Sequence, residues 1–578
     1  MIEIKEKIKK TVEDGLKKEG VKTAKVELKH SADLAHGDFA TNAALVYAKK
    51  VGKSPRELAI DLVRSVTENQ LEEVEKAEVA GAGFINFHLK PKVFALGVTD
   101  ILEKKERFGK SEHLLDEKVM VEYTDPNIFK PFHIGHLMSN AIGESISRLT
   151  EFSGAKVVRM CYPSDTGLHI AKAVWGYKNK LGSVPKDSDS LSEKTAFLGE
   201  AYVFGSSAYE NSKENKAEID ELNKILYEKS DAEANKIYEK GRTWSLEHFE
   251  ELYAVLGTKF DEYIFESEVA GRGKEITLEF LKKGVFEESE GAVIFDGEKR
   301  GLHKRVFVTS KGLPTYEAKE MGLNTEKFKR HEDLERSIIV TASEQDDYFK
   351  VVLSALSEVD EKIGHKTEHI SHGMMRFAEG KMSSRKGNVI TGEALLKQVK
   401  NLVKEKMKER DFSEEKREET AEIIAVGAIK YSILRQAIGG DIVFELEKSV
   451  SFEGDSGPYL QYSHTRASSV LAKARAENFQ FPISNFQFPE KRNEPNSLER
   501  LIIRFPEIVE RAASEYAPHH IVTYLTEIAG QFNSWYAKEK IVDKGDPSSP
   551  YKIALTYAFA QVMKNGLWLL GIKTPEKM

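Results

Sequence analysis

The sequence predicts a multidomain α/β protein in which a parallel-sheet domain lies between an N-terminal α+β domain and a C-terminal all-α helical domain. Three observations predict this fold class. The chain has 578 residues, more than a single hydrophobic core usually serves. A strand, a helix and a second strand follow one another within residues 118–162, which is the pattern of a βαβ unit with parallel strands. From about residue 391 onward the pattern is helical.

Residues 1–110 are predicted to form the small α+β domain. Charged helical stretches alternate there with apolar pieces, and residues 83–89 have the composition of a strand. A helix is expected to begin at Pro55 with Ser54 as its cap. A serine hydroxyl can accept a free backbone N–H at a helix start, and proline fits the first turn.

Residues 111–395 are predicted to form the parallel-sheet domain. Strands are expected at residues 119–123 and 156–162, with a helix between them that Gly154 ends. Residues 175–257 are polar and rich in Lys, Glu and Ser, and we expect them to form a helical insertion. Further strands are expected at three places, residues 291–295, 305–308 and 337–341.

Residues 396–578 are predicted to be helical without strands. The charged run at residues 404–419 mixes both signs at short range, so we interpret it as a solvated helix face. Residues 480–495 combine proline, asparagine and phenylalanine and are expected to form a loop.

Composition limits the function classes. With 86 basic and 93 acidic residues the net charge is −7, which excludes a wholly basic surface but leaves a local basic groove for nucleic acid open. Cys161 is the only cysteine, so an internal disulfide and Cys-rich zinc sites are excluded and no zinc is expected. No apolar run approaches the ~18 residues of a membrane span, and the first residues lack the apolar core of a signal peptide. We expect a cytoplasmic protein without a membrane partner.

The most informative motif is His-Ile-Gly-His at residues 133–136, at the start of the first βαβ helix. A helix N-terminus offers free N–H groups and the positive end of the helix dipole, which suits phosphate. Gly135 allows a ligand to approach the backbone, and His133 and His136 can donate hydrogen bonds to a phosphate that gains charge. The alternative is that both histidines only cap and pack the helix.

A second motif, Lys-Met-Ser-Ser-Arg-Lys-Gly at residues 381–387, is basic and lies between glycines. Such a loop suits a lid over a triphosphate, although alone it is more often a charged surface turn. Its occurrence after the His-Ile-Gly-His motif, across a parallel-sheet pattern, favours nucleotide chemistry.

Other candidate motifs are weaker. Residues 271–274 lack the first glycine and the hydroxyl residue of a Walker loop. His365, His369 and His372 lead into a predicted strand, where their spacing does not converge, so structural or surface roles are expected. No metal site is predicted.

The paired motifs resemble those of class I aminoacyl-tRNA synthetases, and longer matches resemble the arginyl-tRNA synthetase family over essentially the whole chain. The matching segments are residues 37–42, 84–86, 121–137, 455–466 and 562–578. The resemblance implies a Rossmann-like catalytic domain at 111–395, an N-terminal tRNA-binding domain at 1–110, and a helical domain at 396–578 that binds the anticodon from about residue 455. It implies a tRNA(Arg) ligase that uses L-arginine, ATP and ATP-bound Mg²⁺ and acts as a monomer.

An arginine pocket needs planar carboxylates and an aromatic face for the guanidinium. The resemblance implies that six positions bind arginine, with Asn127 on the α-amino group. These positions are Glu122, Asp125, Asn127, Tyr316, Glu320 and Gln345. Without the resemblance, ordinary surface ion pairing would be the preferred interpretation of Glu122 and Glu320.

The resemblance also implies the ATP and tRNA contacts. Catalytic roles fall to Lys130, His133, His136 and Lys381. The ATP-binding positions are His133, Gly135, His136, Gly373, Met374, Met375, Lys381 and Ser383, and the tRNA-binding positions are Phe84, Asn86, Tyr462, Phe532, Tyr536 and Met578. Aromatic side chains can stack on splayed RNA bases, although any of these could instead belong to the core.

Several positions depart from the family pattern. Glu320 stands where aspartate is usual, Asp125 where serine is common, and Thr166 where tryptophan is typical. Ser384 replaces the second lysine of the loop, and the resemblance implies that Lys130 compensates. An alternative function is a synthetase-like tRNA-binding or regulatory protein without charging activity.

Overall fold

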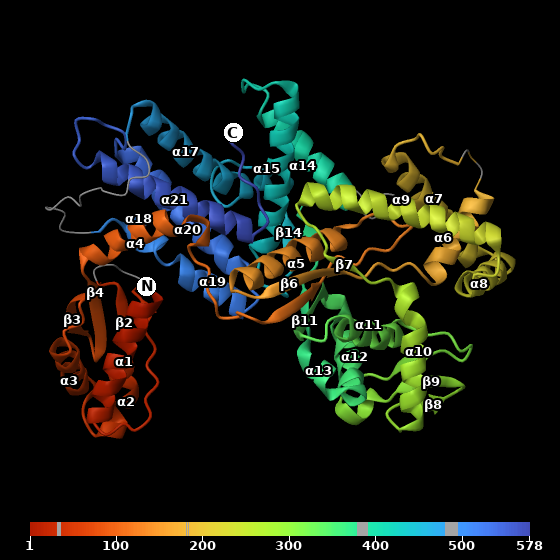
Figure 1. Ribbon diagram of the computed structural model, residues 1–578, viewed down its shortest axis with the longest axis horizontal. Helices are drawn as coiled ribbons and strands as arrows, with labels where there is room; N and C mark the ends of the chain where they lie inside the picture. Colours follow the sequence, from red (N-terminus) through yellow and green to blue (C-terminus); the bar gives the residue numbers. More distant parts are fainter. Residues whose placement is uncertain (32–35, 181, 183, 379–390, 480–494) are drawn as a thin grey trace. The chain divides into compact units, whose positions relative to one another are not determined.

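The computed structural model describes residues 1–31, 36–180, 182, 184–378, 391–479 and 495–578. The chain forms two compact units (Figure 1). The first unit comprises Met1–Lys110, Ser463–Glu510 and Glu527–Asn565, and the second comprises Ser111–Tyr462, Arg511–Thr526 and Gly566–Met578.

The N-terminal part of the first unit is an α+β fold. Its antiparallel sheet has the order β1-β2-β4-β3, and α1, α2 and α3 lie beside these strands in Figure 1. Ser54 caps α3 in a capping box with Glu57, as expected. The elements are α1 Ile2–Lys18, β1 Lys29–His30, β2 Phe39–Thr41, α2 Ala43–Val51, α3 Pro55–Glu68, β3 Val74–Ala80, β4 Phe84–Leu89, α4 Pro91–Lys104 and η2 Lys105–Arg107.

The second unit is built on a five-stranded parallel sheet of order β12-β11-β5-β6-β7. Helix α5 joins β5 to β6 and packs on β5, β6 and β11, so the predicted βαβ unit is confirmed. Gly154, at φ 105°, follows the end of α5 as expected. The elements are β5 Lys118–Glu122, α5 Ile134–Phe152, β6 Lys156–Cys161, β7 Glu262–Tyr263, β11 Leu334–Ala342, η4 Ser343–Gln345, α12 Asp346–Val359, α13 Glu361–Lys366 and β12 Thr367–His372.

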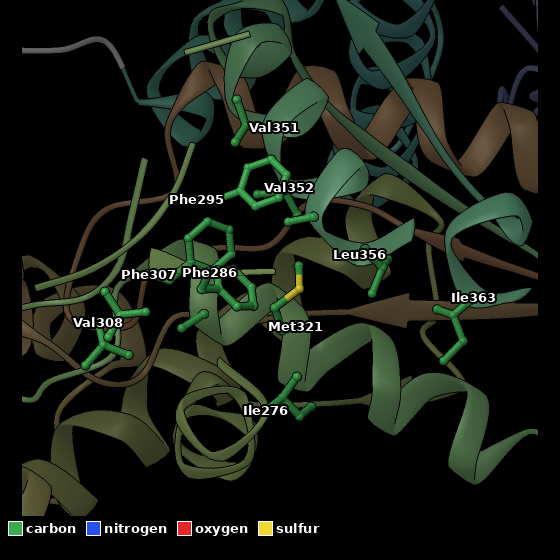
Figure 2. Packing of buried hydrophobic residues seen from close by; sticks show 13 residues of the cluster. Ile276, Phe286, Phe295, Phe307, Val308, Met321, Val351, Val352, Leu356 and Ile363 are labelled. Atoms are coloured by element: carbon green, nitrogen blue, oxygen red, sulfur yellow. The ribbon is translucent and has the colours of Figure 1, made fainter. Parts of the chain in front are cut away.

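A smaller antiparallel sheet, β10-β9-β8, and helices α10, α11 and α12 enclose a second apolar core. Figure 2 shows the rings of Phe286, Phe295 and Phe307 grouped beside Met321 of α11. The ring centroids of Phe286 and Phe307 are 4.8 Å apart. The elements are α10 Glu266–Lys282, β8 Glu287–Ser289, β9 Ala292–Phe295, η3 Gly297–Arg300, β10 Arg305–Val308 and α11 Tyr316–Arg330.

The polar stretch after β6 is helical, as predicted. It forms α6 Leu168–Asn179, α7 Leu191–Asn211, α8 Lys213–Glu228 and α9 Ala232–Leu256. The buried Asp165 joins this insertion to the sheet region: Tyr238 of α9 donates a hydrogen bond to its carboxylate (3.1 Å), and the backbone N–H of Ser267 donates another (2.9 Å).

The C-terminal part is mainly helical, with one correction. Residues Ile442–Phe444 form a short strand, β14, which pairs in parallel with β13 (Met375–Phe377), whereas no strand was expected there. Three residues are too few for strand alternation to stand out from a helical pattern. The helices are α14 Gly392–Lys406, α15 Glu414–Leu434, α16 Leu446–Ser449, α17 Gly457–Ala476, α18 Ser497–Ile502, α19 Phe505–Ser514, α20 His519–Lys538 and α21 Ser549–Leu569.

None of the helices in the described part of the chain is long and apolar enough to cross a membrane.

Candidate active site

The first site lies at the N-terminus of α5, where His133 is the N-cap and His136 the third helical residue. The two rings stack with centroids 3.4 Å apart. His133 Nδ1 accepts the N–H of His136, and His136 Nδ1 accepts the N–H of His133, both at 3.3 Å. The pair therefore forms a reciprocal capping box, a role usually taken by serine and glutamate.

These hydrogen bonds decide which ring nitrogens can donate. Burial, together with the charge of Lys130, lowers the pKa of His133 and of the more buried His136, so both rings are neutral. A neutral imidazole carries one proton, and each Nδ1 is an acceptor here. The proton of each ring is therefore on Nε2, which leaves two Nε2–H donors for a ligand.

A cavity of about 660 Å³ lies against this helix start. His133, Gly135 and His136 line it, together with Met374 and Met375. A Cβ at Gly135 would meet the His133 ring at 3.0 Å, so glycine keeps both imidazoles in place.

Gly373, also a predicted ATP-binding residue, lines a smaller neighbouring cavity. A Cβ there would meet the carbonyl oxygen of Gly440 at 2.2 Å, so this glycine is needed for close backbone packing. His372, for which a structural role was expected, lines the larger cavity as well.

Of the two predicted phosphate-binding lysines, Lys130 lies within the described residues. Lys130 is half-buried, and its Nζ lies 4.8 Å from the centroid of the Tyr202 ring on the helical insertion. Lys381 and Ser383 lie outside the described residues.

A second cavity, of about 410 Å³, contains all six residues predicted to bind arginine. Glu122 ends β5, Asp125 and Asn127 follow in the next loop, Tyr316 and Glu320 lie on α11, and Gln345 ends η4. These segments are far apart in the sequence, and the parallel sheet with its connecting helix brings them together.

The loop after β5 is strained. Thr124 and Asp125 have φ values of 82° and 42°, a left-handed conformation that non-glycine residues adopt at a cost of about 1–3 kcal/mol each. The backbone N–H of Tyr162 donates a 2.7 Å hydrogen bond to Asp125 Oδ1, and the hydroxyl of Ser139 accepts the N–H of Thr124 at 3.0 Å. These bonds hold Asp125 where it lines both cavities.

The second cavity favours a cation. Burial, reinforced by the nearby Glu122 carboxylate, raises the pKa of Glu320 to about 8. The same two causes raise the pKa of Asp125 well above its usual value. A group that resists ionisation for these reasons will ionise when a cation binds beside it.

Several further residues of this cavity were not predicted from the sequence. Tyr162, Ser164, Glu266 and Tyr348 also line it, and the buried Lys327 forms an ion pair with Glu122. Lys327 follows Tyr316 and Glu320 at helical spacing on α11, which is the signal that could have identified it.

Two of the predicted tRNA-binding residues are buried in the structure. Phe532 is fully buried, and its ring stacks on Phe559 with centroids 4.0 Å apart. Asn86 is 4% exposed on β4, which lies between β2 and β3. Both side chains lie in the core here, and their assignment to tRNA stays a prediction.

The other four have some exposure. Phe84 and Tyr536 are 45% and 40% exposed. Tyr462 is half-buried and lies edge-on to Phe452. Met578 is half-buried, and its carbonyl oxygen accepts a hydrogen bond from Arg410.

The two cavities adjoin each other, because five residues line both: Asp125, Asn127, Thr341, Glu344 and Gln345. A cationic molecule in the smaller cavity can therefore reach a phosphate bound at the start of α5.

Comparison with known proteins agrees with this geometry. Residues 97–446 match the family of tRNA synthetases class I (R), catalytic domain. Residues 3–89 match the arginyl tRNA synthetase N terminal domain, and residues 460–578 match the DALR anticodon binding domain.

Relatives extend over nearly the whole chain. An arginine–tRNA ligase of Limosilactobacillus reuteri is 31% identical, covering 99% of this chain and all of its own length. One of Treponema denticola is 32% identical over 92% of this chain and 91% of its own. The fold is similar to that of Thermus thermophilus arginyl-tRNA synthetase, with a TM-score of 0.79 at 23% identity, covering 99% of this chain and all of that one. The chain belongs to the class I arginyl-tRNA synthetase family.

Proposed function

We propose that this chain activates L-arginine with ATP, forming arginyl-adenylate and pyrophosphate, and transfers the arginyl group to the 3′ end of tRNA(Arg). One observation carries the proposal: the cavity that holds Asp125 and Glu320 shares its lining with the cavity at the start of α5. Arginine bound through its cationic groups in the cavity of about 410 Å³ presents its carboxylate to ATP in the cavity of about 660 Å³ at the start of α5.

The first step is an in-line displacement. The arginine carboxylate attacks the α-phosphorus, and the bond to the oxygen of the leaving pyrophosphate breaks. The Nε2–H groups of His133 and His136 donate hydrogen bonds to the phosphates, while Lys130 and Lys381 neutralise their charge and Ser383 adds a contact. The carboxylate is already an anion, so catalysis comes from positioning and charge stabilisation.

In the second step the terminal ribose hydroxyl of tRNA takes the arginyl group and AMP leaves. Mg²⁺ is proposed to arrive with ATP and to neutralise phosphate charge. The described residues include no group of three or more His, Cys, Asp or Glu side chains arranged to hold a metal ion, and we assign none to the magnesium.

We assign tRNA contacts to Phe84, Tyr462, Tyr536 and Met578, with support from the exposure of Phe84 and Tyr536. Asn127 is assigned to the α-amino group, and Gly373, Met374 and Met375 to the neighbourhood of adenine. The monomeric state and the cytoplasmic location stay predictions.

The direct test is aminoacylation of matched tRNA with each proteinogenic amino acid in turn, with ATP and Mg²⁺. Charging with arginine alone is expected. Charging with another amino acid would overturn the assignment of the pocket. Tight tRNA binding without charging would favour a regulatory protein.

A second test separates activation from tRNA binding. His136→Ala removes one phosphate donor and is expected to lower the rate of arginine-dependent ATP–pyrophosphate exchange by about 10²–10³, with tRNA affinity retained. His365→Ala, a substitution of an exposed histidine, is the matched control and should leave the exchange unchanged. Full exchange activity in His136→Ala would refute the phosphate assignment.

A further inference from the structure

Helix α11 carries a row of polar side chains on one face. Tyr316, Glu320, Asn324 and Lys327 follow one another at intervals of three or four residues, which places them on the same side of a helix. The amide of Asn324 donates a 3.0 Å hydrogen bond to the carbonyl oxygen of Glu320. The opposite face is apolar and packs Met321 into the core of Figure 2.

Lys327 is unusual within this row because it is 0% exposed. A buried ammonium is expensive unless a carboxylate compensates it. Its partner is Glu122 at the end of β5, which is 2% exposed and lines the arginine cavity. The pair thus joins α11 to the parallel sheet at the lining of the arginine cavity.

Some of the charges around this cavity are compensated within the protein. Glu266 and Lys319 form a buried pair at 2.7 Å, and Glu344 is exposed, so water screens it. The ion pairs of the cavity and its immediate neighbours are Glu122–Lys327, Glu266–Lys319 and Glu317–Arg305.

Among the cavity carboxylates that are buried or half-buried, two have no such partner. Neither Asp125 nor Glu320 forms an ion pair within the described ranges of the chain. Arginine brings two cationic groups, a guanidinium and an α-ammonium. Among the buried and half-buried carboxylates, the count of two unpaired ones holds only while Lys327 compensates Glu122.

We propose that Lys327 is a positioning residue that sets the charge of the arginine pocket: by compensating Glu122, it leaves two uncompensated carboxylates for a doubly cationic amino acid. The inference rests on the proposed function. Glu122 then acts as an oriented hydrogen-bond acceptor, and Glu320 supplies the net charge that holds the guanidinium.

The charge environment of Glu320 makes this role measurable. The Lys327 ammonium lowers the pKa of Glu320 and that of Asp125, whereas Glu122 raises both. Removing the ammonium should therefore make arginine binding require a higher pH. The charged groups that act on Glu320 are Glu122 and Asp125 from the β5 side, Glu266 of α10, and Glu317 and Lys327 of α11.

The experiment measures KM for arginine against pH in the full-length enzyme, by ATP–pyrophosphate exchange with tRNA(Arg) present. In Lys327→Met, the pH at which KM for arginine falls is expected to rise by about one unit or more. KM for ATP should stay unchanged. Lys327→Arg keeps the charge and should keep the wild-type profile. Lys329→Met, at an exposed position of the same helix, is the matched control.

Two further variants keep the test decisive if Lys327→Met does not fold. Glu122→Gln leaves Lys327 uncompensated, so the profile should move to lower pH. Glu122→Gln combined with Lys327→Met removes one charge of each sign, and the profile should return towards wild type. If Glu122→Gln and the double variant both had the same pH midpoint as the wild type, the role of Lys327 would be overturned. Arginine charging by the wild type would still leave the proposed function standing.

Discussion

At the residue scale, the pocket depends on carboxylates that are not fully ionised when it is empty. Glu320 is 7% exposed and has a pKa of about 8, so at pH 7 it is mostly protonated. A guanidinium beside it favours the ionised form. Arginine binding and deprotonation of Glu320 are therefore linked.

This linkage predicts proton release. At pH 7, binding of arginine should release up to about one proton, and affinity should increase as pH rises towards 8, because less work is then needed to ionise Glu320. Calorimetry in two buffers of different ionisation enthalpy measures the released protons. Glu320→Asp keeps a carboxylate and should still release this proton, whereas Glu320→Gln should release fewer protons than the wild type. Binding without proton uptake or release in the wild type would contradict the expectation.

At the scale of elements, α11 is positioned by its crossing with α10. A Cβ at Gly273 would meet the carbonyl oxygen of Ala318 at 1.9 Å, and a Cβ at Gly322 would meet that of Val269 at 2.3 Å. The two helices are in backbone contact at these glycines. The 271–274 segment does not fit a phosphate loop, and its Gly273 serves helix packing instead.

The crossing predicts a paired result. Gly273→Ala should lower the free energy of unfolding by about 1–3 kcal/mol, because a methyl group overpacks the contact, and should raise KM for arginine by displacing Tyr316 and Glu320. Gly271→Ala, on the same helix with nothing within 4 Å, should be neutral or stabilising by up to about 1 kcal/mol. Denaturant unfolding and the kinetics of ATP–pyrophosphate exchange distinguish the two variants. Equal effects of both substitutions on stability and on KM for arginine would contradict the packing argument.

At the scale of the whole molecule, the buried Lys430 of α15 joins distant parts of the second unit. Its ammonium donates hydrogen bonds to the carbonyl oxygens of Leu256, at the end of α9 (2.7 Å), and of Gly571, near the C-terminus (3.0 Å). Burial, with the Arg148 charge, lowers the pKa of Lys430 to about 7.

This pKa predicts how stability varies with pH. Between pH 7 and about 10, the unfolded chain binds a proton at Lys430 that the folded chain does not, so stability increases with pH, by up to about 1.4 kcal/mol per unit. The difference in thermal midpoint between wild type and Lys430→Met should therefore grow from pH 7 to pH 9. Lys416→Met, exposed on the same helix, should show no such trend, and a constant difference for Lys430→Met would contradict the pKa shift.

In the first unit, residues of a family motif have structural contacts. Residues 37–42 resemble a tRNA-binding segment, yet Asp38 is buried: it accepts the N–H of Leu89 at 2.8 Å and forms an ion pair with Arg500. Gly37, at φ 83°, approaches the backbone of Phe87. The motif marks the family, but its residues here hold the fold together.

The sequence by itself determined the βαβ unit and the paired histidines at the start of α5. The βαβ unit, the Ser54 cap and the His133–His136 pair depend on residues a few positions apart, so local hydrogen bonds and helical spacing fix them. The tertiary structure decided which carboxylates are compensated and which aromatic residues are buried. Lys327 meets Glu122, and Phe532 packs on Phe559, only because the folded chain brings distant segments together, and burial then sets the energy of each charge.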